Sequence, residues 1–122
     1  MNKRVLGEDI EALVSDYLTL QGAKILKRNY RCRQGEVDII ALDGKYLCFI
    51  EVKFRNGQRF GQPQEAVNKA KQKRICNVSQ FYLYSNYKSF DVPVRYDVIA
   101  VSPQDGIYTL NWIKNAFDFT GR

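Results

Sequence analysis

The segment CFIEVKFRNG, residues 48–57, carries an acid and a lysine inside a run that otherwise reads as a buried strand. Glu51 and Lys53 alternate with large apolar residues, so both side chains are expected on one face of that strand. Desolvating a charge costs several kcal/mol, so charged groups hold such positions when they are paired or used in chemistry. The segment therefore predicts either a structural ion pair or a reactive site.

The preceding strand brings further carboxylates to the same face. EVDIIALDGKYLCFIEVKF (36–54) is two β-rich runs joined by Asp43-Gly44, a strong hairpin signal. A loop centred on that dipeptide pairs Asp38 with Phe49, and Asp38 then lies diagonal to Glu51 at roughly 7–8 Å. The same register pairs Glu36 with Glu51, so the predicted face carries Glu36, Asp38, Glu51 and Lys53.

Such a group of acids needs compensating positive charge. Close carboxylates repel one another unless a proton or a cation lies between them, and Lys53 supplies a single charge. A divalent metal that prefers oxygen ligands is one solution, because Mg²⁺ typically takes one or two carboxylates and keeps several waters. An ion pair between Lys53 and one acid, with the other acids solvated, is the alternative.

Composition removes several classes of chemistry. The chain has 122 residues and no histidine, which excludes Ser-His and Cys-His nucleophiles and histidine-ligated zinc. Catalysis must then use carboxylates, lysine, tyrosine or a hard metal ion. The net charge of +6 favours nucleic acid or another anionic partner. The length predicts one domain, residues 1–122, with a single sizeable core.

The cysteines and the hydropathy pattern predict a cytoplasmic location. Cys32, Cys48 and Cys76 are odd in number and include no close pair, which argues against disulfides and zinc ribbons. No run of 18 uncharged apolar residues occurs, and no cleavable leader is recognisable. We therefore expect neither a membrane span nor secretion.

Periodicity and turn signals predict an α/β domain with a mixed sheet. Gly22 is expected to end the first helix, and Pro63 suits the first turn of the second. Asp105-Gly106 predicts a second hairpin. The expected order is α-β-β-β-α-β-β, with helices over 8–21 and from 63 to about 84, and strands over 23–32, the two halves of 36–54, 94–101 and 107–113.

The acid, the hairpin and the Glu-X-Lys on the next strand are similar to the D-(X)n-E-X-K arrangement of the PD-(D/E)XK nuclease superfamily, which includes archaeal Holliday-junction resolvases. More specifically, the chain resembles the YraN-like family of small bacterial proteins. The resemblance covers nearly the whole chain and implies a restriction-endonuclease-like fold, a mixed central β-sheet flanked by helices. The segments that carry it are GEVDIIALDG (35–44), FIEVKFR (49–55), FGQPQEAVNKAKQKRI (60–75), RYDVIAV (95–101) and IKNAF (113–117).

The resemblance also implies roles for individual residues. Asp38 and Glu51 would be ligands of Mg²⁺ or Mn²⁺, and Lys53 would position or activate the attacking water. Superfamily members often add an acid from the first helix, for which Glu11 is favoured as a further catalytic ligand and Glu8 competes. Val37 stands where the superfamily name has proline.

Basic residues flank the predicted site. They could contact DNA phosphates, or they could form a solvated helix face. They are Arg55 and Arg59 in the loop and Lys69, Lys71, Lys73 and Arg74 on the second helix. Asp97, beside Arg95 in RYDVIAV, is interpreted as structural.

These features together predict a Mg²⁺-dependent endonuclease that hydrolyses phosphodiester bonds of DNA. A single small domain has little room to read sequence, which favours structure-specific or non-specific cleavage. The alternatives are a nucleic-acid-binding module without independent cleavage and a structural or adaptor protein. A homodimer or a protein partner, and the choice among junction, flap, duplex and single-stranded substrates, stay open.

Overall fold

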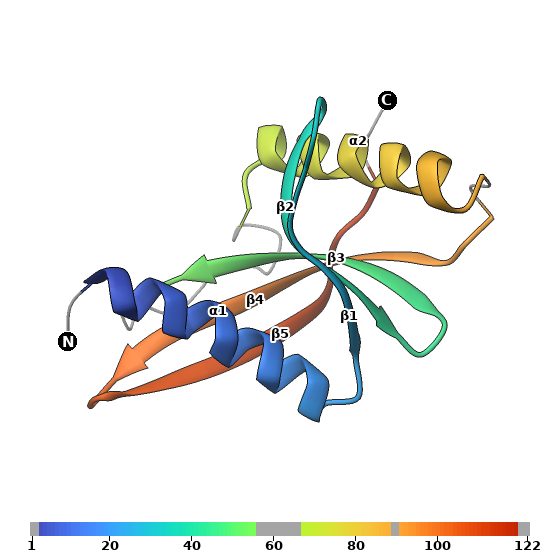
Figure 1. Cartoon of the computed structure of the whole chain (residues 1–122). Coiled ribbons are helices and arrows are strands. Elements are labelled where there is room, and N and C mark those ends of the chain that lie inside the picture. The colour runs from blue at the N-terminus through green and yellow to red at the C-terminus, as the bar shows by residue number, and fades with distance from the viewer. Residues whose placement is uncertain (1–2, 56–66, 89–90, 120–122) are drawn as a thin grey trace.

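The computed structural model describes residues 3–55, 67–88 and 91–119, and their side chains except those of residues 3–9 and Gln104 (Figure 1). The predicted order α-β-β-β-α-β-β is confirmed over these residues. The sheet runs β1-β2-β3-β4-β5 and is mixed, because β3 and β4 are parallel while the other neighbours are antiparallel. The elements are α1 (Lys3–Leu20), β1 (Lys24–Cys32), β2 (Gly35–Asp43), β3 (Tyr46–Phe54), α2 (Lys69–Asn86), β4 (Val94–Gln104) and β5 (Ile107–Phe117).

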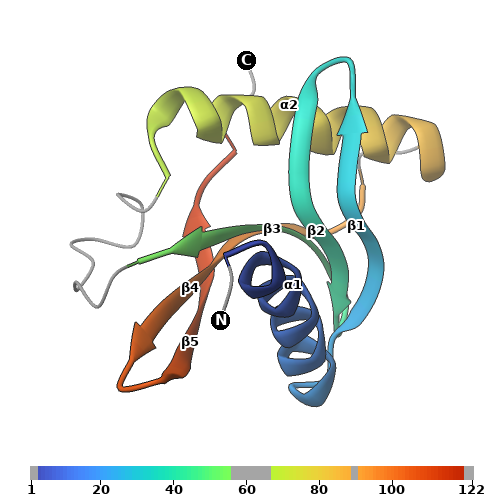
Figure 2. The same ribbon diagram turned by 60° about the vertical axis from the view of Figure 1, so that its left-hand side comes forward.

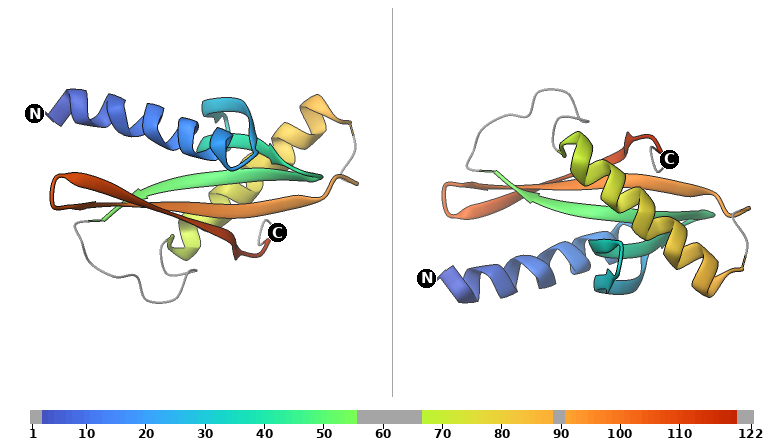
Figure 3. Two further views of the ribbon diagram at one scale, coloured as in Figure 1. Left: turned by 90° about the horizontal axis from the view of Figure 1, so that it is seen from below. Right: turned by 90° about the horizontal axis from the view of Figure 1, so that it is seen from above.

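The two helices cover opposite faces of the sheet (Figures 2 and 3). One core cluster packs Ile75 and Val78 of α2 against Phe49 of β3. The other packs Val14 and Leu18 of α1 against the other face of the central strands. Side chains alternate between these clusters along β3, which is buried on both sides. A charged residue in β3 is therefore held between two apolar layers.

Strand β2 changes face at Asp38. Val37 packs in the α2 cluster and Ile39 in the α1 cluster, although strict alternation would put residues two apart on the same face. The β1–β2 hairpin bends and rises beside α2 (Figure 2). Gly35 sits at the tip, where a Cβ would lie 3.6 Å from Val78, and its φ of 140° favours glycine. Asp38 thus lies at a bend in the strand.

The predicted hairpin register is wrong by one turn position. Asp43 lies opposite Tyr46, so the turn residues are Gly44 and Lys45. Gly44 has a φ of 59° and occupies the first central position, where a type II′ turn places its glycine. Phe49 consequently lies opposite Ile40 and not opposite Asp38. A register change of two residues alters the cross-strand neighbours but does not by itself turn a side chain to the other face. Glu36, predicted to share the face of Glu51, instead lies before the bend at Asp38 and pairs with Arg31 at 3.0 Å.

The second Asp-Gly dipeptide behaves as predicted. Gln104 lies opposite Ile107, so Asp105 and Gly106 are both central turn residues. Their φ values of 52° and 82° are positive, as a type I′ turn requires.

The helix bounds differ from the prediction at both N-termini. The first helix begins at Lys3 and not at residue 8, and it ends before Gly22, whose φ is 101°. The second begins at Lys69, because Asn68 caps it by accepting the N–H of Lys71 at 2.8 Å. Pro63 and Arg59 lie outside the described residues. No helix in the described ranges is long and apolar enough to cross a membrane.

Candidate functional site

Asp38 and Glu51 are closer neighbours than the predicted register made them. The paired register ends where Ile39 lies opposite Ile50, and the next residues of the two strands, Asp38 and Glu51, are close enough for their side chains to interact. Asp38 Oδ2 accepts the backbone N–H of Val52 at 2.8 Å, which ties the carboxylate of β2 to β3. The fold therefore places two carboxylates side by side on adjacent strands.

Glu51 is a buried acid whose ion-pair partner comes from α2. Its side chain is 10% exposed, and its Oε2 lies 2.9 Å from Nζ of Lys71. Burial, and after it the charge of Asp38, raise the pKa of Glu51 to about 7, although the hydrogen bond and charge of Lys71 lower it. The hydrogen bond to Glu51 in turn raises the pKa of Lys71. One ammonium does not neutralise two adjacent carboxylates.

Lys53 lies on the same face of β3 as Glu51, because the residue between them packs on the α1 side. Its side chain is half-buried and makes no hydrogen bond or ion pair with another residue in the described ranges. The predicted alternative, an ion pair between Lys53 and one of the acids, is therefore not what the described residues form. Lys71, and not Lys53, pairs with the buried acid.

Glu11 lies near Asp38 from the α1 side of the sheet, the face opposite to Glu51 and Lys53. A pocket of about 200 Å³ is lined by Glu11, Asp38 and Val52, among other residues of α1, β1, β2 and β3. The exposed Glu11 carboxylate accepts weak hydrogen bonds from Nδ2 of Asn29, at 3.4 and 3.5 Å. The structure thus brings Glu11 and Asp38 to one pocket, while the side chain of Glu8 lies outside the described residues.

The donor set fits a hard cation bound through two carboxylates. Within the described part of the chain, no three acids or cysteines converge closely enough to hold a metal together, so Glu11 does not complete a triad with the other two. Asp38 and Glu51 are adjacent, and Mg²⁺ commonly binds one or two carboxylates while water or phosphate oxygens fill its remaining positions. The two residues could hold such an ion.

The basic residues predicted to bind phosphate separate into two groups. Lys69, Lys73 and Arg74 are exposed on the N-terminal half of α2, whereas Lys71 turns inward to Glu51. Arg55 is half-buried at the end of β3, where its backbone N–H donates to Val101. No acidic residue occurs in α2. The first turns of α2 therefore present positive charge beside the acidic pair.

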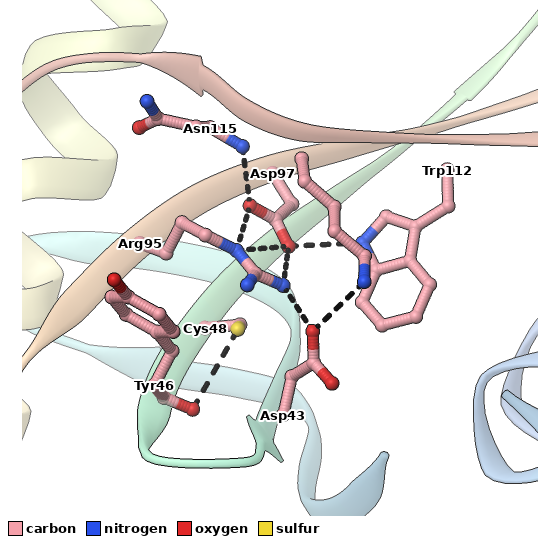
Figure 4. Close-up of polar contacts among 8 residues, drawn as sticks. Asp43, Tyr46, Cys48, Arg95, Asp97, Trp112 and Asn115 are labelled. Atoms are coloured by element: carbon pink, nitrogen blue, oxygen red, sulfur yellow. Dashed lines mark hydrogen bonds and ion pairs between the residues drawn. The ribbon is translucent and has the colours of Figure 1, made fainter. Parts of the chain in front are cut away.

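A second charged cluster is centred on Asp97 (Figure 4). It lies on the α1 side of the sheet, where Trp112 packs against the α1 core cluster. Asp97 is fully buried and accepts hydrogen bonds from the guanidinium of Arg95, the indole N–H of Trp112 and the backbone N–H of Asn115, at 2.9–3.2 Å. Every partner is a donor with good geometry. The structural interpretation of Asp97 agrees with these contacts.

Asp43 extends that cluster across the sheet. Its Oδ2 lies 2.7 Å from Nη2 of Arg95 and 3.1 Å from Nζ of Lys114. The hydrogen bond from Arg95 lowers the pKa of Asp43 below its ordinary value. These partners are 52 and 71 residues away in the chain, so no local pattern indicates them. The Arg-X-Asp on β4 is the one local signal for this cluster.

The cysteines fit the sequence interpretation. Cys48 and Cys76 are buried, Cys32 is partly buried, and no disulfide joins any of them in the described part of the chain. Burial raises the pKa of the Cys48 thiol to about 12. Its thiolate is therefore inaccessible at neutral pH, and Cys48 acts as a core residue.

Comparison with known proteins gives a family but no activity. Residues 10–101 match the uncharacterised protein family UPF0102. A UPF0102 protein of Lachnoclostridium phytofermentans is 44% identical over 99% of both chains. One from Symbiobacterium thermophilum is 45% identical over 96% of this chain and 98% of its own. These matches support the resemblance to the YraN-like family, whereas the nuclease superfamily stays a prediction.

Among solved structures, Pyrococcus furiosus SfsA in complex with Ca²⁺ aligns with 93% of this chain at 12% identity and a TM-score of 0.41. The chain spans 64% of the length of that structure. A match at this TM-score does not establish a shared fold or function.

Proposed function

The chain belongs to the uncharacterised protein family UPF0102, and we propose that it is a metal-dependent endonuclease that hydrolyses phosphodiester bonds of DNA. One observation carries the proposal: Asp38 and Glu51 are adjacent on neighbouring strands, with Lys53 on the same face of β3 as Glu51. A structural pair would need one acid and one base. The second carboxylate is what favours a cation site.

The charge balance supports a divalent metal at this position. Burial, and after it the charge of neighbouring Asp38, disfavour ionised Glu51 even though Lys71 is hydrogen-bonded to it. Asp38 and Glu51 would hold the ion. When bound, a divalent metal polarises phosphate oxygens and lowers the pKa of coordinated water.

Lys53 would act on the reacting groups. Its ammonium has three N–H donors and can orient the attacking water or hold a non-bridging phosphate oxygen. Water attacks phosphorus in line with the leaving oxygen, so a new P–O bond forms as the bond to the leaving strand breaks; the attacking water gives up a proton to solvent, and the leaving oxygen takes one up. Orientation of the nucleophile against phosphorus is the main contribution that the protein can make.

The exposed cations of α2 support DNA as the substrate. Lys69, Lys73 and Arg74 lie on the helix that carries Lys71 to the acidic pair. Contacts of this kind fix the phosphate backbone and carry no base specificity. The proposed cleavage is therefore structure-specific or non-specific.

The Glu51–Lys71 ion pair favours a second candidate function. An acid already paired with a lysine from its own chain suits a DNA-binding module that does not cut. In that case the α2 cations would bind DNA, and the acidic pair would stabilise the packing of α2 on β3.

A cleavage panel with a metal-binding readout tests the proposal. Single-stranded, duplex, flap and four-way junction DNA are incubated with Mg²⁺ or Mn²⁺, and the melting temperature is measured with and without metal. We expect cleavage of at least one substrate, and a metal-induced rise in melting temperature because the ion binds the folded state. Asp38→Asn with Glu51→Gln should abolish both effects, while Asp16→Asn on the exposed side of α1 should keep both.

Each contrary outcome identifies a different error. Metal and DNA binding without cleavage of any substrate would support the binding module. A protein with no response to metal would support the structural role. A double variant that responds to metal as the parent does would show that the site is misplaced.

A further inference from the structure

We propose that Lys71 is an internal counter-ion of Glu51 that a bound divalent metal displaces, and that the released ammonium then binds a phosphate of the DNA. This inference rests on the proposed function and adds a residue to it. It makes metal binding and DNA binding mutually dependent through one side chain.

The backbone around Lys71 is held by the helix cap, whereas its side chain is partly exposed. The N–H of Lys71 donates to the Asn68 cap at 2.8 Å. The next residue, Gln72, is buried and donates from its side chain to the carbonyl of Val67 at 2.8 Å. The Lys71 side chain is 34% exposed and ends on a long flexible stem. A change of partner therefore needs rotation of one side chain and no movement of the helix.

A metal and Lys71 compete for the same carboxylate. The ammonium lies 2.9 Å from Glu51 Oε2, which is hydrogen-bonding distance and leaves no water between them. A divalent ion held by Asp38 and Glu51 would balance their two negative charges. A third positive charge in direct contact would then be repelled, and in a partly buried site this repulsion is poorly screened.

The released ammonium has no acid to turn to on its own helix. The sequence of α2, KAKQKRICNVSQFYLYSN, contains no aspartate or glutamate. The exposed cations Lys69, Lys73 and Arg74 are neighbours of Lys71 on the first turns. The N-terminus of a helix also carries positive partial charge. Within the described residues, α2 thus offers the released ammonium no acid, and a phosphate beside the proposed metal site matches the chemistry of these groups.

A reciprocal effect of metal and DNA follows. Metal frees Lys71 and so should tighten DNA binding, and by thermodynamic linkage DNA should tighten metal binding by the same factor. Without Lys71 the metal no longer competes with an ammonium for Glu51, so at a pH where Glu51 is ionised the metal should bind more tightly in the absence of DNA. The effect of DNA on metal affinity, and of metal on DNA affinity, should then be smaller than in the parent.

The experiment measures Mn²⁺ affinity by calorimetry, with and without a duplex whose phosphorothioate linkages resist hydrolysis. The parent is compared with Lys71→Met and with Lys73→Met, a matched control two residues along at an exposed position. In the absence of DNA, Lys71→Met should bind Mn²⁺ about tenfold more tightly than the parent, within the usual range of such couplings. Lys73→Met should keep the parent's Mn²⁺ affinity and its coupling while weakening DNA binding.

Either an unchanged Mn²⁺ affinity or an undiminished coupling in Lys71→Met overturns the inference. Lys71→Gln, which removes the charge but stays polar, gives the same readout if Lys71→Met does not fold. If the parent binds Mn²⁺ and cleaves DNA and the Lys71 variants behave identically, the inference about Lys71 is wrong but the proposed function stands. A parent that binds no Mn²⁺ would contradict both the inference and the proposed function.

Discussion

Glu51 and Asp97 are the charged side chains that are buried within the described part of the chain, and they occupy opposite faces of the same sheet. Asp97 is surrounded by donors from three different residues. Glu51 has one ammonium and a second carboxylate beside it. A buried acid whose oxygens are all hydrogen-bonded to donors stabilises the fold. A buried acid that lies beside a second carboxylate can bind a further cation.

The two clusters also respond to pH with opposite sign. The raised pKa of Glu51 means that the folded state holds a proton which the unfolded state has already released. Stability from this site therefore falls as pH rises from the ordinary value of 4.5 to about 7. The lowered pKa of Asp43 contributes stability above the ordinary value of 3.8, and that contribution is lost as pH falls through the folded pKa.

The largest effect is expected in the paired cluster. Asp97→Ala leaves Arg95 as a mostly buried charge, with Asp43 as its remaining acid, and it removes the acceptor for Trp112. Breaking such a pair should lower the free energy of unfolding by about 3–5 kcal/mol, measured by urea titration. Asp16→Ala, at an exposed position, is the control and should change it by less than about 0.5 kcal/mol. A loss below about 1 kcal/mol for Asp97→Ala would contradict the structural assignment.

A change at Lys53 should affect chemistry and spare stability. Lys53→Ala removes an ammonium that has no ion-pair partner among the described residues, so the melting temperature should hold and metal and DNA should still bind. Cleavage should fall by roughly 10²-fold or more, the scale for losing a group that handles a proton or orients the nucleophile. Lys45→Ala in the exposed hairpin turn is the control. Unfolding of Lys53→Ala, beside a parent that cuts nothing, would support the structural reading.

The smallest effect is the pH dependence set by Glu51. The parent should lose of order 1–3 kcal/mol of stability from this site between pH 5 and pH 7.5, relative to Glu51→Gln, which cannot ionise. Urea titrations of both proteins at the two pH values measure the difference. Metal should reduce it, because a cation favours ionised Glu51. Parallel pH profiles for the two proteins would show that Glu51 ionises normally.

The sequence predicts the order of elements because hydrophobic period and turn residues are local properties. It misplaces the first hairpin although the same dipeptide occurs in both. Asp43 ends a strand, where its carboxylate binds Arg95 and Lys114, while Asp105 takes a left-handed turn position. Nothing within a few residues of Asp43 encodes those tertiary partners. The position of the turn therefore depends on contacts made elsewhere in the chain.

In the candidate site too, local sequence patterns predict some features and tertiary contacts determine the others. Asp38, Glu51 and Lys53 are identified by alternation along two strands, which is a local rule. The ion-pair partner of Glu51 cannot be identified in this way, because it depends on where α2 begins and on which side of the helix faces β3. Lys71 is one of several lysines in a run, and the cap at Asn68 decides which one points inward. Whether the basic residues touch DNA stays a prediction.

The contact between Asp97 and Asn115 also bears on association between molecules. Strand β5 is an edge of the sheet, and such edges can recruit strands from other chains. Between Tyr96 and Val98 the pairing with β5 is irregular, and Asn115, at a φ of 56°, donates its N–H to the side chain of Asp97 on β4 and not to a backbone carbonyl of that strand. This bulge interrupts the flat ladder that edge-to-edge pairing requires. We therefore expect the carboxylate that organises the interior also to disfavour strand addition at this end of β5.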